Sequence, residues 1–258
     1  MKVFVCIKQV PDTEAKLKIL PDQSGVDGAG IKWVMNPYDE FAVEEAIKFR
    51  EANAGAQVLV LTLGPKPRAA EVLRTALAMG ADEGLLINAP ENLDNFSTAR
   101  ALAEVIKQEG GAHLIFTGKV AIDDNSSSVS QMLAEFLSLP HATVVSKFSK
   151  GTDGFVVERD VEGGAKELIQ LSGASVVAAN KGLNMPRYAS LPGIMKAKKK
   201  TLKEIEFSSL GVSSAEQKIK FTTLTLPPEK PPAKLIPGDS SAQVSTLVQL
   251  LRDEAKVL

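Results

Sequence analysis

The chain has 258 residues, of which 44% are hydrophobic and 24% charged, so it can bury the core of one large domain. Its formal net charge of −1 gives the whole molecule no bias towards nucleic acid or an anionic membrane. The single cysteine, Cys6, excludes an internal disulfide and any CxxC motif. Because no apolar segment is long enough to span a membrane and the N-terminus lacks a signal-peptide pattern, we expect a soluble, intracellular protein without membrane insertion.

The first 148 residues alternate short apolar runs with segments of helical periodicity. Val3–Ile7 is the first predicted strand, in which Cys6 is expected to be a buried, unreactive thiol. Asn36 and Pro37 predict the N-cap and first position of a helix that continues to residue 52. Further strands are predicted at 58–63, 85–87, 114–117 and 143–148, helices at 68–79 and, capped by Ser97, 98–109, and a loop turning into a helix at 123–138.

This alternation predicts an α/β fold: a mostly parallel, Rossmann-like sheet flanked by helices on both faces. Ligands of such sheets bind at the carboxyl ends of the strands. The loops after Ile7, Leu63 and Thr117 are therefore the expected ligand site.

The second half of the chain has a different pattern. Residues 155–159 and 168–171 predict an antiparallel hairpin across Gly163-Gly164, followed by a strand at 175–179. After Lys200 the α/β alternation ends, which divides the chain into a domain over 1–200 and an arm over 201–258. The prolines at 227, 228, 231, 232 and 237 favour an extended arm, which either crosses another subunit or folds back on its own domain. Ser240 or Ser241 is the expected cap of a terminal helix with an apolar stripe of Val244, Leu247, Val248 and Leu251.

Two segments carry the candidate chemistry. Gly118–Val129 follows a predicted strand and precedes a helix, so its backbone N–H groups and serines suit a phosphate. The alternative is that its Asp and Ser residues only cap the helix. Residues 184–200 place Leu191, Ile194 and Met195 beside a run of lysines, in what Pro186, Pro192 and Gly193 indicate is a loop. Such a loop suits protein docking, although Leu191 in the core and a solvated lysine face would give the same pattern.

Neither histidine, His113 or His141, has an evident ligand partner, so we expect no metal site and no Ser/His catalysis. A nucleotide-hydrolysing or ligase-type enzyme that used Asp123-Asp124 would need a metal-binding pair and a phosphate-binding lysine at a characteristic spacing. Only Lys119 lies near these two residues in the sequence. The chain shows no catalytic constellation.

The segment from Arg187 to Lys199 resembles the signature of electron transfer flavoprotein β subunits. Matches to the family occur in the same order from Val3 to about Lys200. They are Asn36-Pro37, Ala42–Ala46, Arg74–Asp82, Gly118-Lys119, Ala121–Asp124, Val157–Arg159 and Gly163-Gly164.

The resemblance implies an electron carrier and not an enzyme. Members form an obligate heterodimer with a larger α subunit, which holds most of the FAD near the interface. They take electrons from flavin-containing dehydrogenases and pass them to a quinone-linked oxidoreductase. The β subunit binds a structural AMP. By position, its contacts fall on Cys6, Asn36, Pro37, Tyr38, Asp39, Leu63, Gly118, Lys119, Val120, Ala121, Ile122, Asp123, Asp124, Asn125, Ser126, Ser127, Ser128 and Val129.

The resemblance also assigns the docking of partner dehydrogenases to one loop. Its residues here are Arg187, Tyr188, Ala189, Ser190, Leu191, Pro192, Gly193, Ile194, Met195 and Lys196. Asp160 corresponds to an acidic position that influences the movement of the FAD-bearing domain. The implied location is the cytoplasm of a bacterium or the mitochondrial matrix of a eukaryote, and no nucleic acid partner is implied.

The chain departs from the family pattern in two places. The loop Asp124–Met132 keeps its length but replaces several side chains, and Thr13 stands where relatives carry an aromatic residue beside the flavin. An electron-bifurcating branch binds a second flavin in place of AMP, but its Asp-Gly-Asp-Thr-Ala-Gln-Val-Gly loop is absent here. AMP is therefore the expected nucleotide. The alternatives are the second flavin and a non-redox AMP-binding regulatory module.

Overall fold

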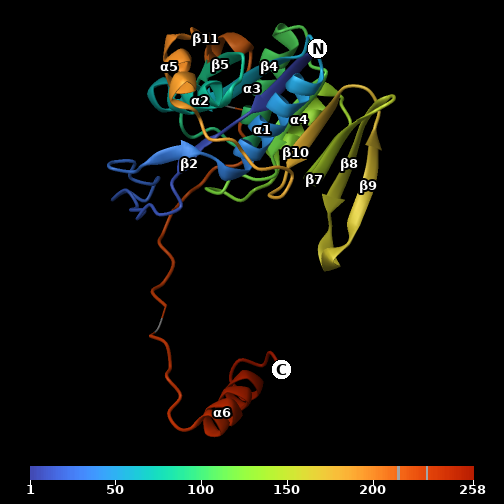
Figure 1. The fold of residues 1–258 in the computed structure, drawn as a ribbon. Coiled ribbons are helices and arrows are strands. Elements are labelled where there is room, and N and C mark those ends of the chain that lie inside the picture. Colours follow the sequence, from blue (N-terminus) through green and yellow to red (C-terminus); the bar gives the residue numbers. More distant parts are fainter. Residues whose placement is uncertain (214–215, 231) are drawn as a thin grey trace.

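The computed structural model describes residues 1–213, 216–230 and 232–258 (Figure 1). Pro231, one of the prolines of the expected arm, lies outside the described residues. The described residues form a nine-stranded sheet in the order β11-β5-β4-β1-β6-β10-β7-β8-β9. The strands are β1 (Lys2–Cys6), β4 (Gln57–Gly64), β5 (Glu83–Asn88), β6 (Leu114–Gly118), β7 (His141–Gly151), β8 (Gly154–Asp160), β9 (Lys166–Leu171), β10 (Ser175–Ala179) and β11 (Leu202–Glu206).

Within this sheet, β11 to β7 are parallel to one another, whereas β7, β8 and β9 are antiparallel. A separate antiparallel pair joins β2 (Gln9–Pro11) to β3 (Trp33–Met35). The predicted α/β class with an antiparallel portion is therefore confirmed, including the hairpin across Gly163-Gly164.

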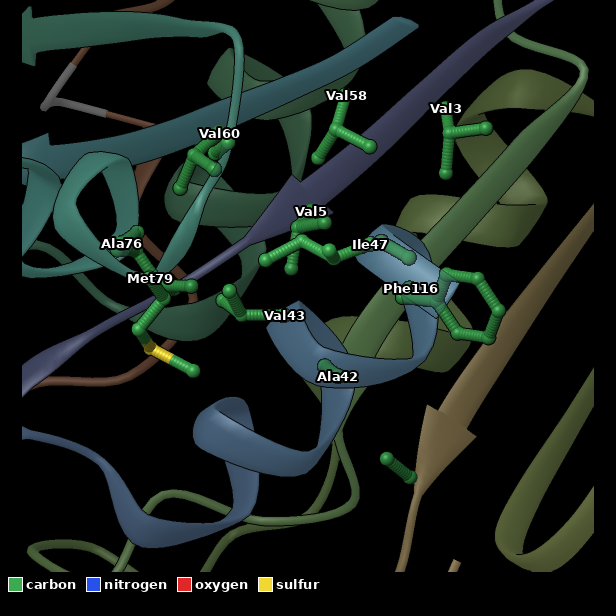
Figure 2. Packing of buried hydrophobic residues seen from close by; sticks show 14 of the residues in the cluster. Val3, Val5, Ala42, Val43, Ile47, Val58, Val60, Ala76, Met79 and Phe116 are labelled. Carbon is green, nitrogen blue, oxygen red and sulfur yellow. The ribbon is translucent and has the colours of Figure 1, made fainter. Parts of the chain in front are cut away.

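Helices cover both faces of the sheet. They are α1 (Pro37–Ala52), α2 (Lys66–Met79), α3 (Asn95–Gln108), α4 (Val129–Leu137) and α5 (Leu191–Lys199), with α6 (Ser240–Asp253) at the end of the arm. Successive side chains of β1 point to opposite faces. Val3 and Val5 pack with α1 and α2, as Figure 2 shows, whereas Phe4 and Cys6 pack with α3 and α4. Central strands buried on both faces explain the continuous apolar runs in the sequence.

Two predicted helix caps are wrong by a few residues. Asp94, and not Ser97, caps α3, because its carboxylate accepts a hydrogen bond from the Ser97 N–H. Asp239, and not Ser240 or Ser241, caps α6 in the same way through the Ala242 N–H. In both cases an aspartate one to three residues before the serine takes the N-cap position, for which both residue types are suited.

The predicted loop over 184–200 contains a helix. Its residues from Leu191 onward form α5, which Ser190 caps by accepting a hydrogen bond from the Gly193 N–H. Pro192 lies in the first turn, where a backbone N–H would have no intrahelical partner, so the proline does not prevent the helix.

The interpretation that the α/β alternation ends at Lys200 is also wrong. β11 pairs in parallel with β5, and Phe207, Leu210 and Val212 then pack into the α3/α4 core. The strand was missed because Leu202–Glu206 is mostly charged, as an edge strand can be. Beyond it, the described part of the arm is extended and carries α6 away from the sheet (Figure 1). α6 buries no residue.

Candidate functional site

The carboxyl ends of β1, β4 and β6 meet at one edge of the sheet, because these strands are adjacent and parallel. Asp39, in the first turn of α1, joins them. Its carboxylate accepts hydrogen bonds from the Lys8 N–H at 2.7 Å, the Gly118 N–H at 3.0 Å and the Asn36 side-chain amide at 3.0 Å. One buried carboxylate thus fixes the start of α1 to the ends of two strands.

Asn36 occupies the N-cap position of α1, as predicted, but its side chain makes no capping hydrogen bond. Its Nδ2 donates to the Val120 carbonyl at 2.9 Å, and its Oδ1 accepts from the Ile122 N–H at 3.2 Å. The side chain therefore fixes the loop that follows β6 instead of capping the helix.

Burial raises the pKa of the Asp39 carboxyl to about 7, although its three hydrogen bonds and Lys8 favour the ionised form. Burial, together with the nearby Asp39 carboxylate, also raises the pKa of the Cys6 thiol, so Cys6 is a neutral packing residue. Cys6 and Leu63 both pack on the α3/α4 side of the sheet, beside the same strand ends.

The pKa of Asp39 predicts a pH-dependent stability. Since its folded value of about 7 exceeds the ordinary 3.8, the folded state retains the proton that the unfolded state releases. The stability that this group contributes is present in full below pH 3.8 and is lost as the pH rises through 7. The melting temperature of the protein minus that of Asp39→Asn should therefore fall between pH 5 and pH 8. A difference that grows with pH would contradict this, and Asp153→Asn, at an exposed turn, is the control.

The segment between β6 and α4 has the backbone of an anion site. Asn125 and Ser127 have φ values of 52° and 49°, and left-handed residues at alternate positions are typical of anion-binding backbone turns. Within the described chain, the N–H groups of Ser127, Ser128, Val129 and Ser130 have no hydrogen-bond acceptor. Free N–H groups at the start of a helix bind phosphate well.

Side chains hold this segment in place from several elements. Lys8, directly after β1, makes ion pairs with Asp123 at 2.8 Å and Asp124 at 3.4 Å. Thr117 and Ser130 share a buried 2.6 Å hydrogen bond between their hydroxyls. Gln131 donates to the Ser127 carbonyl, while its buried Oε1 has no partner in the described chain. The unpaired N–H groups of this segment thus fit a phosphate group, and Gln131 Oε1 remains free within the described chain to accept a hydrogen bond from another part of a ligand.

Sequence reasoning named most of the residues that meet here but missed Lys8, Thr117, Ser130 and Gln131. The sequence did offer a sign that Lys8 belongs to the site, since it is a charged residue at the carboxyl end of the first strand.

Lys119 lies over the Tyr38 ring at 5.1 Å, which joins two of the predicted positions. The described residues contain no group of three or more His, Cys, Asp or Glu side chains that could hold a metal ion.

A second surface lies on and before α5. We define the docking surface as the exposed apolar side chains Met185, Tyr188, Leu191, Ile194 and Met195. Tyr188 is 98% exposed and Leu191 73%, so Leu191 is not a core residue. Lys196, Lys198 and Lys199 follow in the last turn of α5. Several exposed apolar side chains beside basic residues are typical of a protein interaction site.

Asp160 lies at the end of β8. Hydrogen bonds from Ser146 and Asn180 and the nearby Lys166 hold the pKa of its carboxyl below the ordinary value. It lines a cavity of about 530 Å³ together with Lys119, Val144, Arg159, Val161, Glu162 and Asn180. Lys119 also belongs to the phosphate segment, so this cavity adjoins the strand-end site.

No helix among the described residues is long and apolar enough to cross a membrane.

Comparison with known proteins gives the family. The model of the electron transfer flavoprotein domain matches residues 25–210. The chain is similar to electron transfer flavoprotein subunit beta of Bacillus subtilis, with 44% identity over all of both chains. The protein of the same name from Bradyrhizobium diazoefficiens is 41% identical over all of both chains. The human one is 39% identical over 89% of this chain and 90% of its own. With its signature and fold, this similarity shows that the chain belongs to the electron transfer flavoproteins as a β subunit.

Proposed function

We propose that this chain pairs with an electron transfer flavoprotein α subunit and that the heterodimer carries electrons from flavin-containing dehydrogenases to a quinone-linked oxidoreductase. The relatives are named as subunits of electron transfer flavoproteins, which supports a role in electron transfer without bond chemistry of its own. The FAD lies mainly on the α subunit. The heterodimer would work in the cytoplasm of a bacterium or the matrix of a mitochondrion.

In this proposal the strand-end site holds one structural AMP. The observation that carries it is the row of unpaired N–H groups from Ser127 to Ser130, which faces no acceptor in the described chain. These groups would receive the phosphate, while Cys6 and Leu63 would pack against the purine. Asp39 and Asn36 would hold the surrounding segments in place through their hydrogen bonds to Gly118 and the 120–122 backbone.

The docking surface would insert Leu191 into an apolar pocket of the partner dehydrogenase, while the lysines of α5 steer its approach. Asp160 would face the mobile FAD-bearing domain of the α subunit from the rim of its cavity. The arm and α6 would lie across the α subunit, because the apolar stripe of α6, with Val244 and Leu247, is exposed and no described residue covers it.

Co-expression with the α subunit of the same organism tests this proposal. The expected product is a stable heterodimer that contains one FAD and one AMP, measured by flavin absorbance and by chromatography of the released nucleotide. A second flavin in place of AMP would make the protein an electron-bifurcating type. Isolation of the chain as a stable monomer, with or without reversibly bound AMP, would overturn the carrier function.

A further inference from the structure

We infer that Arg187 is a positioning residue for partner docking: its guanidinium, held by two glutamates of α1, fixes the docking surface in the orientation that the dehydrogenase recognises. The inference rests on the docking role proposed above. Residues that the partner need not contact thereby set the orientation of the docking surface.

The contacts of Arg187 are unusually complete. Its Nε and Nη2 donate to the two carboxylate oxygens of Glu44 at 2.8 and 3.0 Å. Its Nη1 and Nη2 donate to Glu51 at 2.7 and 3.1 Å, and its backbone N–H donates to Glu44 at 3.1 Å. Because two-point pairing requires the planar guanidinium, the side chain has one orientation here.

The burial of the Glu44 carboxylate explains why Arg187 stays in this orientation. Glu44 is only 5% exposed, and within the described chain each hydrogen bond to its carboxylate comes from Arg187. A buried carboxylate without a partner is strongly unfavourable, so the pair keeps Arg187 in place as much as it neutralises Glu44. Asn184, which precedes Arg187 in the same segment, donates from its side-chain amide to Glu45 and to the Phe41 carbonyl of α1, each at 2.9 Å. The segment that enters the docking surface is therefore fixed to one face of α1.

The other end of the docking surface is fixed to α2. Arg74 donates to the carbonyls of Ala197 and Lys200, which end α5. Lys200 donates to the carbonyls of Ala81 and Asp82 at 2.7 and 2.9 Å. A Cβ at Gly193 would lie 2.5 Å from the Ala78 carbonyl oxygen, so α5 approaches α2 more closely than any other residue type allows.

The apolar side chains of the docking surface are exposed beside these attachments, and Met185 and Tyr188 are at least 90% exposed. Exposed residues that are held by their neighbours lose less conformational freedom when a partner binds. Arg187 therefore increases the affinity for the partner by fixing the docking surface before the partner binds.

The test is Arg187→Lys in the complete heterodimer, which keeps the positive charge and removes the two-point pairing. With a flavin-containing dehydrogenase that reduces the unchanged heterodimer as donor, KM for the heterodimer should rise about tenfold while kcat changes less than about twofold. Amide hydrogen exchange should quicken over residues 186–195, and the flavin spectrum and AMP content should stay the same. Glu44→Gln, which keeps the shape of the buried partner, should act in the same direction. Arg100→Lys is the control, since Arg100 lies on α3 and pairs with Glu216, neither of which belongs to the docking surface.

The decisive step is to make the same change in a Leu191→Ala heterodimer. If Arg187 acts by placing the docking surface, Arg187→Lys adds little once Leu191 is gone. Equal effects in both backgrounds, or quicker exchange without a change in KM, would overturn the inference. If Leu191→Ala alone leaves KM unchanged, the docking role fails and the inference fails with it. If Leu191→Ala raises KM and Arg187→Lys does not, only the role of Arg187 is lost.

Discussion

Leu191→Ala is expected to reduce kcat/KM for electron transfer from a partner dehydrogenase by about 30-fold, because a central apolar residue of an interface commonly contributes about 2 kcal/mol. The loss should appear mainly in KM, since in the proposed function the side chain contacts the partner and not the flavin. Leu191 is 73% exposed, so its removal opens no cavity in the core. The melting temperature, the flavin spectrum and the AMP content should therefore remain those of the unchanged heterodimer.

Leu168→Ala provides a matched control. Leu168 is also 73% exposed, but it lies on the edge strand β9, away from α5. Steady-state reduction of the heterodimer by the donor dehydrogenase, with the heterodimer concentration varied, separates KM from kcat. If Leu191→Ala and Leu168→Ala give the same kinetics, α5 does not dock the partner.

The parallel strands were predictable because they are buried on both faces and read as apolar runs. β1, β4 and β6 lie within a residue or two of their predicted bounds, so the meeting of their carboxyl ends followed from topology alone. β11 was not predictable in the same way. It is an edge strand, and exposure on one side removes the hydrophobic signal on which the prediction depends.

The contacts that build the two sites could not be predicted, since they join residues far apart in sequence. The carboxylate of Asp39 meets Gly118 79 residues away, Lys8 meets Asp123 115 residues away, and Arg187 meets Glu44 143 residues away. Periodicity reports which face of an element is buried but not which polar side chain of another element it meets. Glu44 shows this well, because in a helical pattern a glutamate reads as a solvent-facing residue, whereas here it is buried.

Gly118→Ala is the second change with a large expected effect, and it tests the strand-end site directly. A Cβ at this position would lie 2.3 Å from Asp39 Oδ1, 2.8 Å from the Cβ of Tyr38 and 3.0 Å from the Asp39 backbone N. The Asp39 carboxylate cannot turn aside without losing its hydrogen bonds to Lys8 and Asn36. Overpacking of this kind typically costs about 1–3 kcal/mol. The start of α1 must therefore move away from the end of β6, and the segment from Lys119 to Ser128 moves with it.

We expect the Gly118→Ala heterodimer to retain its FAD, melt at a lower temperature and contain only a small fraction of one AMP, as measured by chromatography of the released nucleotide. Gly28→Ala is the control, because a Cβ at Gly28 would approach only the Trp33 ring, at 3.8 Å. A full complement of AMP in Gly118→Ala would mean that the nucleotide does not bind at these strand ends. Loss of FAD together with AMP would instead show that the strand-end site and the proposed subunit interface are one structural unit.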